Sequence, residues 1–139
     1  MRYLLDTCVI SELAKPEPNE KVVAWTTQND EENFYLSSLT FGELHKGIAK
    51  LPPSKRKENL LQWVEHDLTD RFKTRIIDIT LKIAKHWGET QGICESQGRP
   101  MPTLDGLIAA TGLAHDLTVV TRNITDMQQS GVSLLNPWE

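Results

Sequence analysis

Short apolar runs alternate along the chain with longer stretches in which apolar residues recur every three or four positions. The short runs predict strands and the longer stretches predict amphipathic helices. Four strands and a short fifth are expected at residues 2–5, 34–37, 75–79, 117–121 and 132–136. Helices are expected at residues 7–14, 19–28, 39–51, 54–70, 80–98 and 103–115. This alternation favours crossover connections and a mainly parallel sheet covered by helices on both faces.

Local signals mark several of the expected boundaries. Asn19 is expected to cap the helix that follows it, and Pro52 and Pro53 to end the helix before them. No internal repeat, low-complexity tract or linker interrupts the pattern. We therefore expect residues 1–139 to form a single α/β domain.

Composition and cysteine usage are those of an ordinary globular protein. At 139 residues the chain is long enough to bury a core without disulfides. No apolar stretch approaches the roughly 20 residues of a membrane span, and the start lacks the apolar segment of a signal peptide. Cys8 and Cys94 have no C-x-x-C spacing, which argues against a disulfide framework or a zinc site. A cytoplasmic location is therefore expected, without membrane association.

The net charge of −4 conceals an uneven distribution. Residues 46–85 hold 10 of the 15 Lys and Arg residues against five acids, so this segment is +5 and the remainder is −9. The stretch "KGIAKLPPSKRK" alone has five basic residues and no acid. Two interpretations stay open: a solvated helix-loop-helix surface, or a phosphate-facing rim around an acidic centre.

Four polar residues are expected at the carboxyl edge of the sheet. Asp6 follows the first strand and Asn123 follows the fourth, while Glu43 and Asp105 lie in the first turns of helices that follow strands or loops. Open α/β sheets place their working sites at this edge. The four residues are therefore candidates for one common site.

Each acid also has a purely structural interpretation. Asp6 is suited to cap the helix from Thr7, and the T-x-x-E spacing of Thr40 and Glu43 matches a capping box. Asp105 would be favoured by the positive end of a helix dipole, and Asp126 is suited to cap a last short helix.

Taken together, the acids favour a metal site. The apolar helix "GLIAATGLA" follows Asp105, and Glu43 lies between Phe41 and Leu44, so both carboxylates are expected to face inward. Buried acids without cations raise one another's pKa and destabilise the fold. A divalent ion removes this cost, and all-oxygen ligands suit Mg²⁺, with Mn²⁺ as the alternative.

Four segments carry a resemblance to a known family. The stretches "LLDTCVISEL", "SSLTFGELHKGI", "PTLDGLIAATGLAHDLTVVTRN" and "NPW", in this order, resemble the signature segments of PIN-domain proteins. They are most similar to the FitB-like branch of the VapC toxins of type II toxin–antitoxin systems. The resemblance covers residues 1–139 and implies a PIN-like three-layer α/β/α sandwich.

The resemblance implies a set of site residues. Asp6, Glu43 and Asp105 match the metal-binding acids, and Asn123 matches a fourth catalytic position that is often Asp in the family. The amide supplies less negative charge, which leaves the number of metal ions open. Asp126 is the nearby acid that would compensate.

Two further residues are predicted to support the site. Thr7 is placed to hydrogen-bond it, although the next position, often Asn in the family, is Cys8. Arg122 would meet either a phosphate or a structural ion-pair partner.

The resemblance also implies a function and partners. It implies an Mg²⁺-dependent endoribonuclease in which a metal-activated water cleaves RNA. It implies a cognate small antitoxin of the VapB or FitA type, a homodimer, a hetero-oligomer with the antitoxin, and operator DNA binding only through the antitoxin. The antitoxin tail is expected in a hydrophobic groove for which Val23, Trp25 and Leu44 are candidates.

Three other functions compete with this one. A non-catalytic PIN-fold binding module is favoured by Asn123, and a housekeeping PIN nuclease in RNA processing shares the same acids. A phosphoacceptor receiver domain would need an acidic neighbour at Asp6 and a Lys before Pro137, and the chain has neither. Asp78 is then expected only to cap the helix beginning at Thr80.

Overall fold

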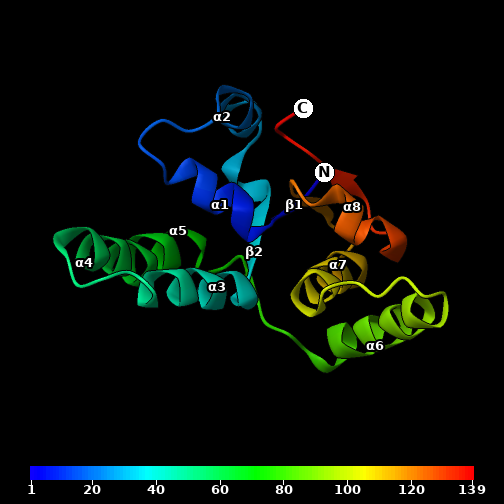
Figure 1. Ribbon diagram of the computed structural model, residues 1–139. Coiled ribbons are helices and arrows are strands. Elements are labelled where there is room, and N and C mark those ends of the chain that lie inside the picture. The colour runs from blue at the N-terminus through cyan, green and yellow to red at the C-terminus, as the bar shows by residue number, and fades with distance from the viewer.

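The computed structural model covers residues 1–139 and consists of short strands separated by helices (Figure 1). The strands are β1 Tyr3–Leu5, β2 Phe34–Ser37, β3 Ile76–Ile77, β4 Thr118–Val120 and β5 Leu134–Leu135. The α-helices are α1 Thr7–Leu13, α2 Glu20–Thr27, α3 Ser38–Ala49, α4 Lys55–Gln62, α5 Thr69–Phe72, α6 Leu81–Ser96, α7 Thr103–His115 and α8 Ile124–Met127. Short η segments lie at Glu31–Asn33, Trp63–Leu68 and Gln128–Ser130. None of the helices has the length and hydrophobicity that a membrane span requires.

The strands form one sheet in the order β3-β2-β1-β4-β5. Every neighbouring pair is parallel, so the expected sheet is confirmed and is parallel throughout. Tyr3 of the central strand β1 lies opposite Phe34 on one side and Thr118 on the other. All five carboxyl ends therefore meet at one edge, where β1 and β4 are direct neighbours.

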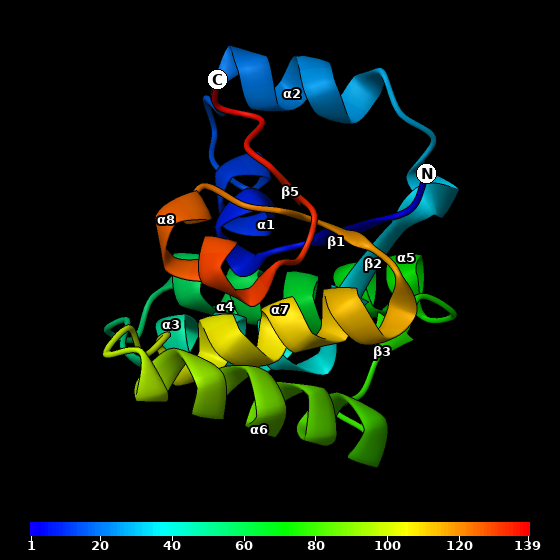
Figure 2. The ribbon, with the colours of Figure 1, turned by 90° about the vertical axis from the view of Figure 1, so that its right-hand side faces the viewer.

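Helices cover both faces of the sheet and bury two hydrophobic clusters. Leu4 and Leu5 belong to different clusters, because successive residues of a strand point to opposite faces. The Leu5 cluster packs against α1, α2 and the α4–α5 segment, and the Leu4 cluster packs against α7 and α8. Figure 1 shows α1 and α3–α5 on one side of the sheet and α6–α8 on the other. Figure 2 shows α6 running along the outer side of α7.

The long helix expected over residues 54–70 is interrupted. Residues Trp63–Leu68 form a π-helical turn between α4 and α5. The Thr69 hydroxyl donates to the carbonyl of Val64, five residues earlier, at 2.8 Å. Val64 and Leu68 are both buried, so the wider turn keeps two apolar residues spaced by four on the core side. Periodicity alone does not distinguish this turn from a continuous α-helix.

The caps expected for α3 and α6 are wrong, and the cap expected for α2 is confirmed. α3 is capped by Ser37, whose hydroxyl accepts from the Leu39 amide, so Thr40 is an interior residue and forms no capping box. α6 is capped by Thr80 and not by Asp78. Asn19 caps α2 as expected, accepting from two amides of its first turn.

Candidate active site

Asp6 lies at the carboxyl end of the central strand β1 and only 4% of it is exposed. Its Oδ1 accepts from the Thr7 backbone amide at 2.9 Å and therefore caps α1. Its Oδ2 accepts from the Thr121 hydroxyl at 2.8 Å. The expectation that Asp6 caps α1 is thus confirmed, and the cap uses only Oδ1 of the carboxylate.

Burial raises the pKa of Asp6 above its ordinary value, and the hydrogen bonds from Thr121, Thr7 and Cys8 oppose that rise. Burial and the nearby Asp6 charge raise the pKa of the Cys8 thiol as well. The thiol therefore stays protonated, and it donates a long contact of 3.8 Å to Asp6 Oδ2. Cys8 acts here as a weak hydrogen-bond donor to the acid.

Glu43 lies in the second turn of α3 and is held by α1. The Thr7 hydroxyl donates to Glu43 Oε1 at 2.7 Å and lies 3.2 Å from the buried hydroxyl of Thr40. Thr7 therefore contacts two acids, Asp6 through its amide and Glu43 through its hydroxyl. Because Thr7 is the first residue of α1, the start of this helix fixes the relative position of both carboxylates.

Asp105 lies in the first turn of α7 and is half-buried. Burial, followed by the charges of Asp6, Asp126 and Glu43, raises its pKa to about 6. Four acids from four segments therefore share one electrostatic field. The ion pairs of the chain involve other acids, namely Glu12, Glu31 and Asp70, so no Lys, Arg or His neutralises this group.

Asn123 and its neighbours lie at the rim of this group. Asn123 is exposed at the N-cap position of α8, and its backbone N–H donates to the Thr121 hydroxyl at 2.9 Å. Asp126 is inside α8 and does not cap it, so that expectation is wrong. Arg122 lies over the Trp138 ring at 5.0 Å, a cation–π contact in place of an ion pair.

Thr121 is the site residue that the sequence analysis missed. It is fully buried, donates to Asp6 and accepts from Asn123, and so links the ends of β1 and β4. A signal for it exists, because Thr121 directly follows β4 as Asp6 follows β1. Recognising the signal requires knowing that these two strands are neighbours.

The donor set suits a divalent cation. Burial and then three neighbouring carboxylates raise the pKa of Asp105, and a hard cation would relieve the repulsion among the four acids. The acids do not form a ready-made ligand cluster, since no three His, Cys, Asp or Glu side chains are arranged to hold an ion. Mutual repulsion favours such spacing. The chemistry of the residues therefore fits Mg²⁺ or Mn²⁺, and the ligand set Asp6, Glu43 and Asp105 stays a prediction.

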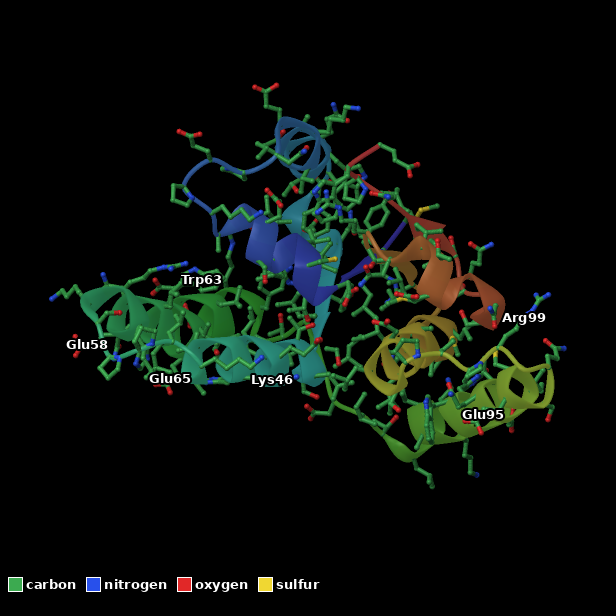
Figure 3. The ribbon with its side chains drawn as sticks, viewed as in Figure 1. Lys46, Glu58, Trp63, Glu65, Glu95 and Arg99 are labelled. Carbon is green, nitrogen blue, oxygen red and sulfur yellow. The ribbon has the colours of Figure 1, made fainter.

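A groove of about 420 Å³ opens beside the acids between α1, α3 and the α4–η2 segment. Thr7 and Glu43 lie at one end, and Leu44, Ile48 and Trp63 contribute apolar side chains. Trp63 lies between the α4–η2 segment and α1 (Figure 3).

Of the three residues expected to line an apolar groove, only Leu44 does so. Trp25 instead packs on Tyr3 and Phe34 with ring centroids 5.0 and 5.3 Å apart. Val23 lines neither this groove nor the apolar pocket beside it. The aromatic contacts draw α2 onto the sheet, away from the groove.

Comparisons with known proteins agree with this fold. The PIN domain family matches residues 3–127. Toxin FitB of Neisseria gonorrhoeae is 38% identical over 135 residues, 97% of each chain. VapC ribonuclease Y4jK of Sinorhizobium fredii is 34% identical over 136 residues, 98% of this chain and 97% of the relative.

A solved structure of FitAB bound to an IR36 DNA fragment superimposes with a TM-score of 0.92. The two chains are 36% identical, and the match covers 99% of this chain and 96% of the other. Both the sequence and the three-dimensional likeness run along nearly the whole chain. The chain therefore belongs to the PIN domain family, in the group that contains FitB and VapC.

Proposed function

We propose that this protein is the toxin of a type II toxin–antitoxin system and a metal-dependent endoribonuclease acting in the cytoplasm. The observation that carries the proposal is the group of four carboxylates without a neutralising cation, centred on Asp105 at the carboxyl edge of the sheet. The names of its relatives, a toxin and a ribonuclease, support the same activity.

Asp6, Glu43 and Asp105 would hold Mg²⁺, with Mn²⁺ as a substitute. The bound ion would lower the pKa of a water molecule and neutralise charge on the phosphate. Asp6 and Glu43 are oriented by hydroxyl donors from Thr121 and Thr7. These two carboxylates therefore have fixed positions before any ligand arrives.

Asp105 is the carboxylate best suited to accept the proton of the attacking water. Its side chain accepts no hydrogen bond within the chain and is half-exposed, so solvent reaches it. Asn123 would contribute an uncharged amide at the rim.

A small antitoxin of the VapB or FitA type is the partner that fits the proposal. The relative FitB was solved within FitAB on DNA, which supports operator binding through the antitoxin. The apolar part of the groove beside Glu43 offers a surface for an antitoxin tail. A homodimer and a hetero-oligomer with the antitoxin belong to the same proposal.

A non-catalytic binding module is the second candidate, because one observation favours it. Asn123 is neutral at the fourth position, and the acids do not form a closed ligand cluster. A PIN fold with weak metal affinity would keep the groove and the partner while losing the chemistry. The experiment below separates the two.

The test compares three proteins on total bacterial RNA, each freed of antitoxin. They are the wild type, an Asp6→Ala, Asp105→Ala variant, and a control Glu65→Ala, Asp67→Ala variant that removes two exposed acids elsewhere. Each is incubated with Mg²⁺, Mn²⁺ or EDTA, and fragments are separated on denaturing gels. We expect discrete fragments from the wild type and the control, abolished by EDTA and reduced at least about a hundredfold in the site variant. Intact RNA with folded, metal-loaded wild type would support the binding module instead.

A further inference from the structure

The hairpin formed by α3 and α4 carries five cations close to the candidate active site. They are Lys46, Lys50, Lys55, Arg56 and Lys57, all exposed except the half-buried Lys57. None of them belongs to an ion pair, although Lys57 Nζ donates to the Leu51 carbonyl at 3.0 Å. A cluster of cations without carboxylate partners is a surface that attracts an external anion.

Two of these cations follow directly from the acidic site along one helix face. Glu43, Lys46 and Lys50 are spaced by three and four residues on α3, so they share one face. Lys50 lies about 10 Å beyond Glu43 along the helix axis, at 1.5 Å per residue. Figure 3 shows Lys46 on this helix. The face therefore changes from acidic at the site to basic at the hairpin.

Arg56 continues the basic surface from α4. It lines the same groove as Glu43, so the groove has the acid at one end and a guanidinium on its wall. Lys15 also lines the groove, but its Nζ lies 3.0 Å from Glu12 Oε1 and is already paired. Arg56 is thus the unpaired cation of the groove.

The positions of these cations offset the repulsion between the acidic site and a polyanion. The four carboxylates repel any polyanion, and the chain outside residues 46–85 carries −9. Cations beside the site lower the electrostatic energy of a polyanion that approaches from their side. A backbone phosphate placed at the acids would therefore have its neighbours best accommodated over Lys46, Lys50 and Arg56.

We propose that Lys46, Lys50 and Arg56 bind the RNA backbone next to the cleaved bond and set substrate affinity. This inference rests on the proposed nuclease function. RNA is favoured over an acidic protein because a phosphodiester chain would use both surfaces at once, with the reacting phosphate at the metal ion proposed to be held by the acids and its neighbours at the cations. An acidic peptide has no scissile phosphate to place at that ion and would gain mainly from the cations.

The test uses a Lys46→Gln, Lys50→Gln, Arg56→Gln triple variant of the full chain. Its matched control is Lys21→Gln, Lys82→Gln, Lys85→Gln, which removes three exposed and unpaired cations from α2 and α6. Cleavage of a labelled RNA pool is followed with Mg²⁺ to obtain KM and kcat. Binding of the same pool is measured by fluorescence polarisation in the Asp6→Ala, Asp105→Ala background at several salt concentrations. Thermal melting confirms that each variant is folded.

We expect the triple variant to raise KM at least tenfold with kcat unchanged within twofold. In the binding arm, the slope of log K against log salt should fall by about 2, since each single-strand phosphate contact contributes roughly 0.7. The control variant should change KM by less than twofold and the salt slope by only a fraction of a unit. A triple variant that behaves like the control, or a parent protein that binds no RNA, would overturn the inference.

The two arms keep the inference separate from the proposed function. Wild type that binds RNA but cleaves none would contradict the nuclease, while a reduced salt slope in the triple variant would still support the RNA surface. Loss of the co-purified antitoxin with unchanged RNA binding would assign the hairpin to a protein partner and overturn the inference.

Discussion

At the residue level, Asp6 has a structural role in addition to its proposed role as a metal ligand. One oxygen caps α1 through the Thr7 amide, and the other accepts from Thr121. A carboxylate buried to this extent is costly unless donors face it. Thr121 thus contributes to the site by orienting Asp6 and by opposing the rise in the Asp6 pKa that burial causes.

Replacing Thr121 by Val should weaken the site without unfolding the protein. The variant loses the donor to Asp6 Oδ2, so the Asp6 pKa should rise further and metal affinity and kcat should fall by about 10–100-fold. Stability should fall by about 1 kcal/mol. Mg²⁺ titration of the cleavage rate measures the effect, and Thr121→Ser should restore most of it.

The control is Thr118→Val, which removes another buried hydroxyl, from strand β4 itself, three residues before Thr121. Thr118 bonds Ser133 and does not contact the acids. Equal losses of activity in the two variants, or no rescue by Thr121→Ser, would contradict a positioning role for Thr121.

Asp105 should make stability depend on pH in an unusual direction. Its folded pKa of about 6 exceeds the ordinary value of 3.8, so between these values the folded state holds more protons than the unfolded state. The contribution of this group to stability is therefore present below about pH 4 and lost as pH rises to about 6. Asp105→Asn should raise the free energy of unfolding at pH 7.5 by about 1 kcal/mol, allowing for solvent screening.

Urea unfolding in EDTA between pH 4 and pH 7.5 measures this difference. The stability of Asp105→Asn relative to wild type should be near zero at pH 4 and positive at pH 7.5. A difference that does not change with pH would show that the raised pKa is not the cause. A lower stability of the variant at pH 7.5 would contradict the repulsion among the acids.

At the level of elements, the close packing of α7 against the sheet depends on a glycine. An added Cβ at Gly112 would meet side-chain carbons of Val119 and Val132 at 2.8 Å and the Leu117 carbonyl at 3.1 Å. The backbone of α7 at Gly112 therefore lies so close to β4 that a residue with a Cβ would not fit without a shift. This contact places the helix that carries Asp105 against the sheet.

Gly112→Ala should destabilise the protein by about 1–3 kcal/mol because β4 and its neighbours have to shift. Gly92→Ala is the matched control in a neighbouring helix, since its Cβ would meet nothing within 4 Å. The control should be neutral or gain about 0.5–1 kcal/mol from helix propensity. Chemical denaturation of both variants measures the contrast, and a stable Gly112→Ala variant would mean that α7 is seated less tightly.

The sequence predicts the elements well where one local signal decides. Asn19 marks the start of α2, and the alternation of strands and helices indicates the parallel sheet. The start of α3 agrees with the expected helix to within one residue, but the capping box at Thr40 is wrong because the hydroxyl of Ser37 caps the helix instead. The π turn at Val64 depends on burial that periodicity does not show.

The same distinction holds for the site. Asp6, Glu43 and Asp105 were predicted because strand ends and helix starts can be located from sequence. Thr121 depends on which strands are neighbours, and the groove around Trp63 depends on how α4 packs on α1. These features arise from long-range contacts, which local patterns do not contain.

At the level of the whole molecule, two hydrophobic clusters on opposite faces of the sheet support a strained acidic edge. Leu4 and Leu5 of the central strand belong to one cluster each, and the next residue is Asp6. The end of β1 is therefore held from both sides, so the acids remain near one another despite their repulsion. Neutralising them should then stabilise the entire fold.

Mg²⁺ should raise the melting temperature of the wild type even when no RNA is present. A ligand that binds only the folded state stabilises it by about 1.4 kcal/mol at ten times its Kd, which is roughly 4 °C for a domain of this size. The Asp6→Ala, Asp105→Ala variant should gain little from Mg²⁺, because two of the proposed ligands are gone. Differential scanning fluorimetry at constant ionic strength measures both effects. Equal Mg²⁺ shifts in the two proteins would place the ion elsewhere, whereas a shift confined to the wild type would locate metal binding at the acids independently of catalysis.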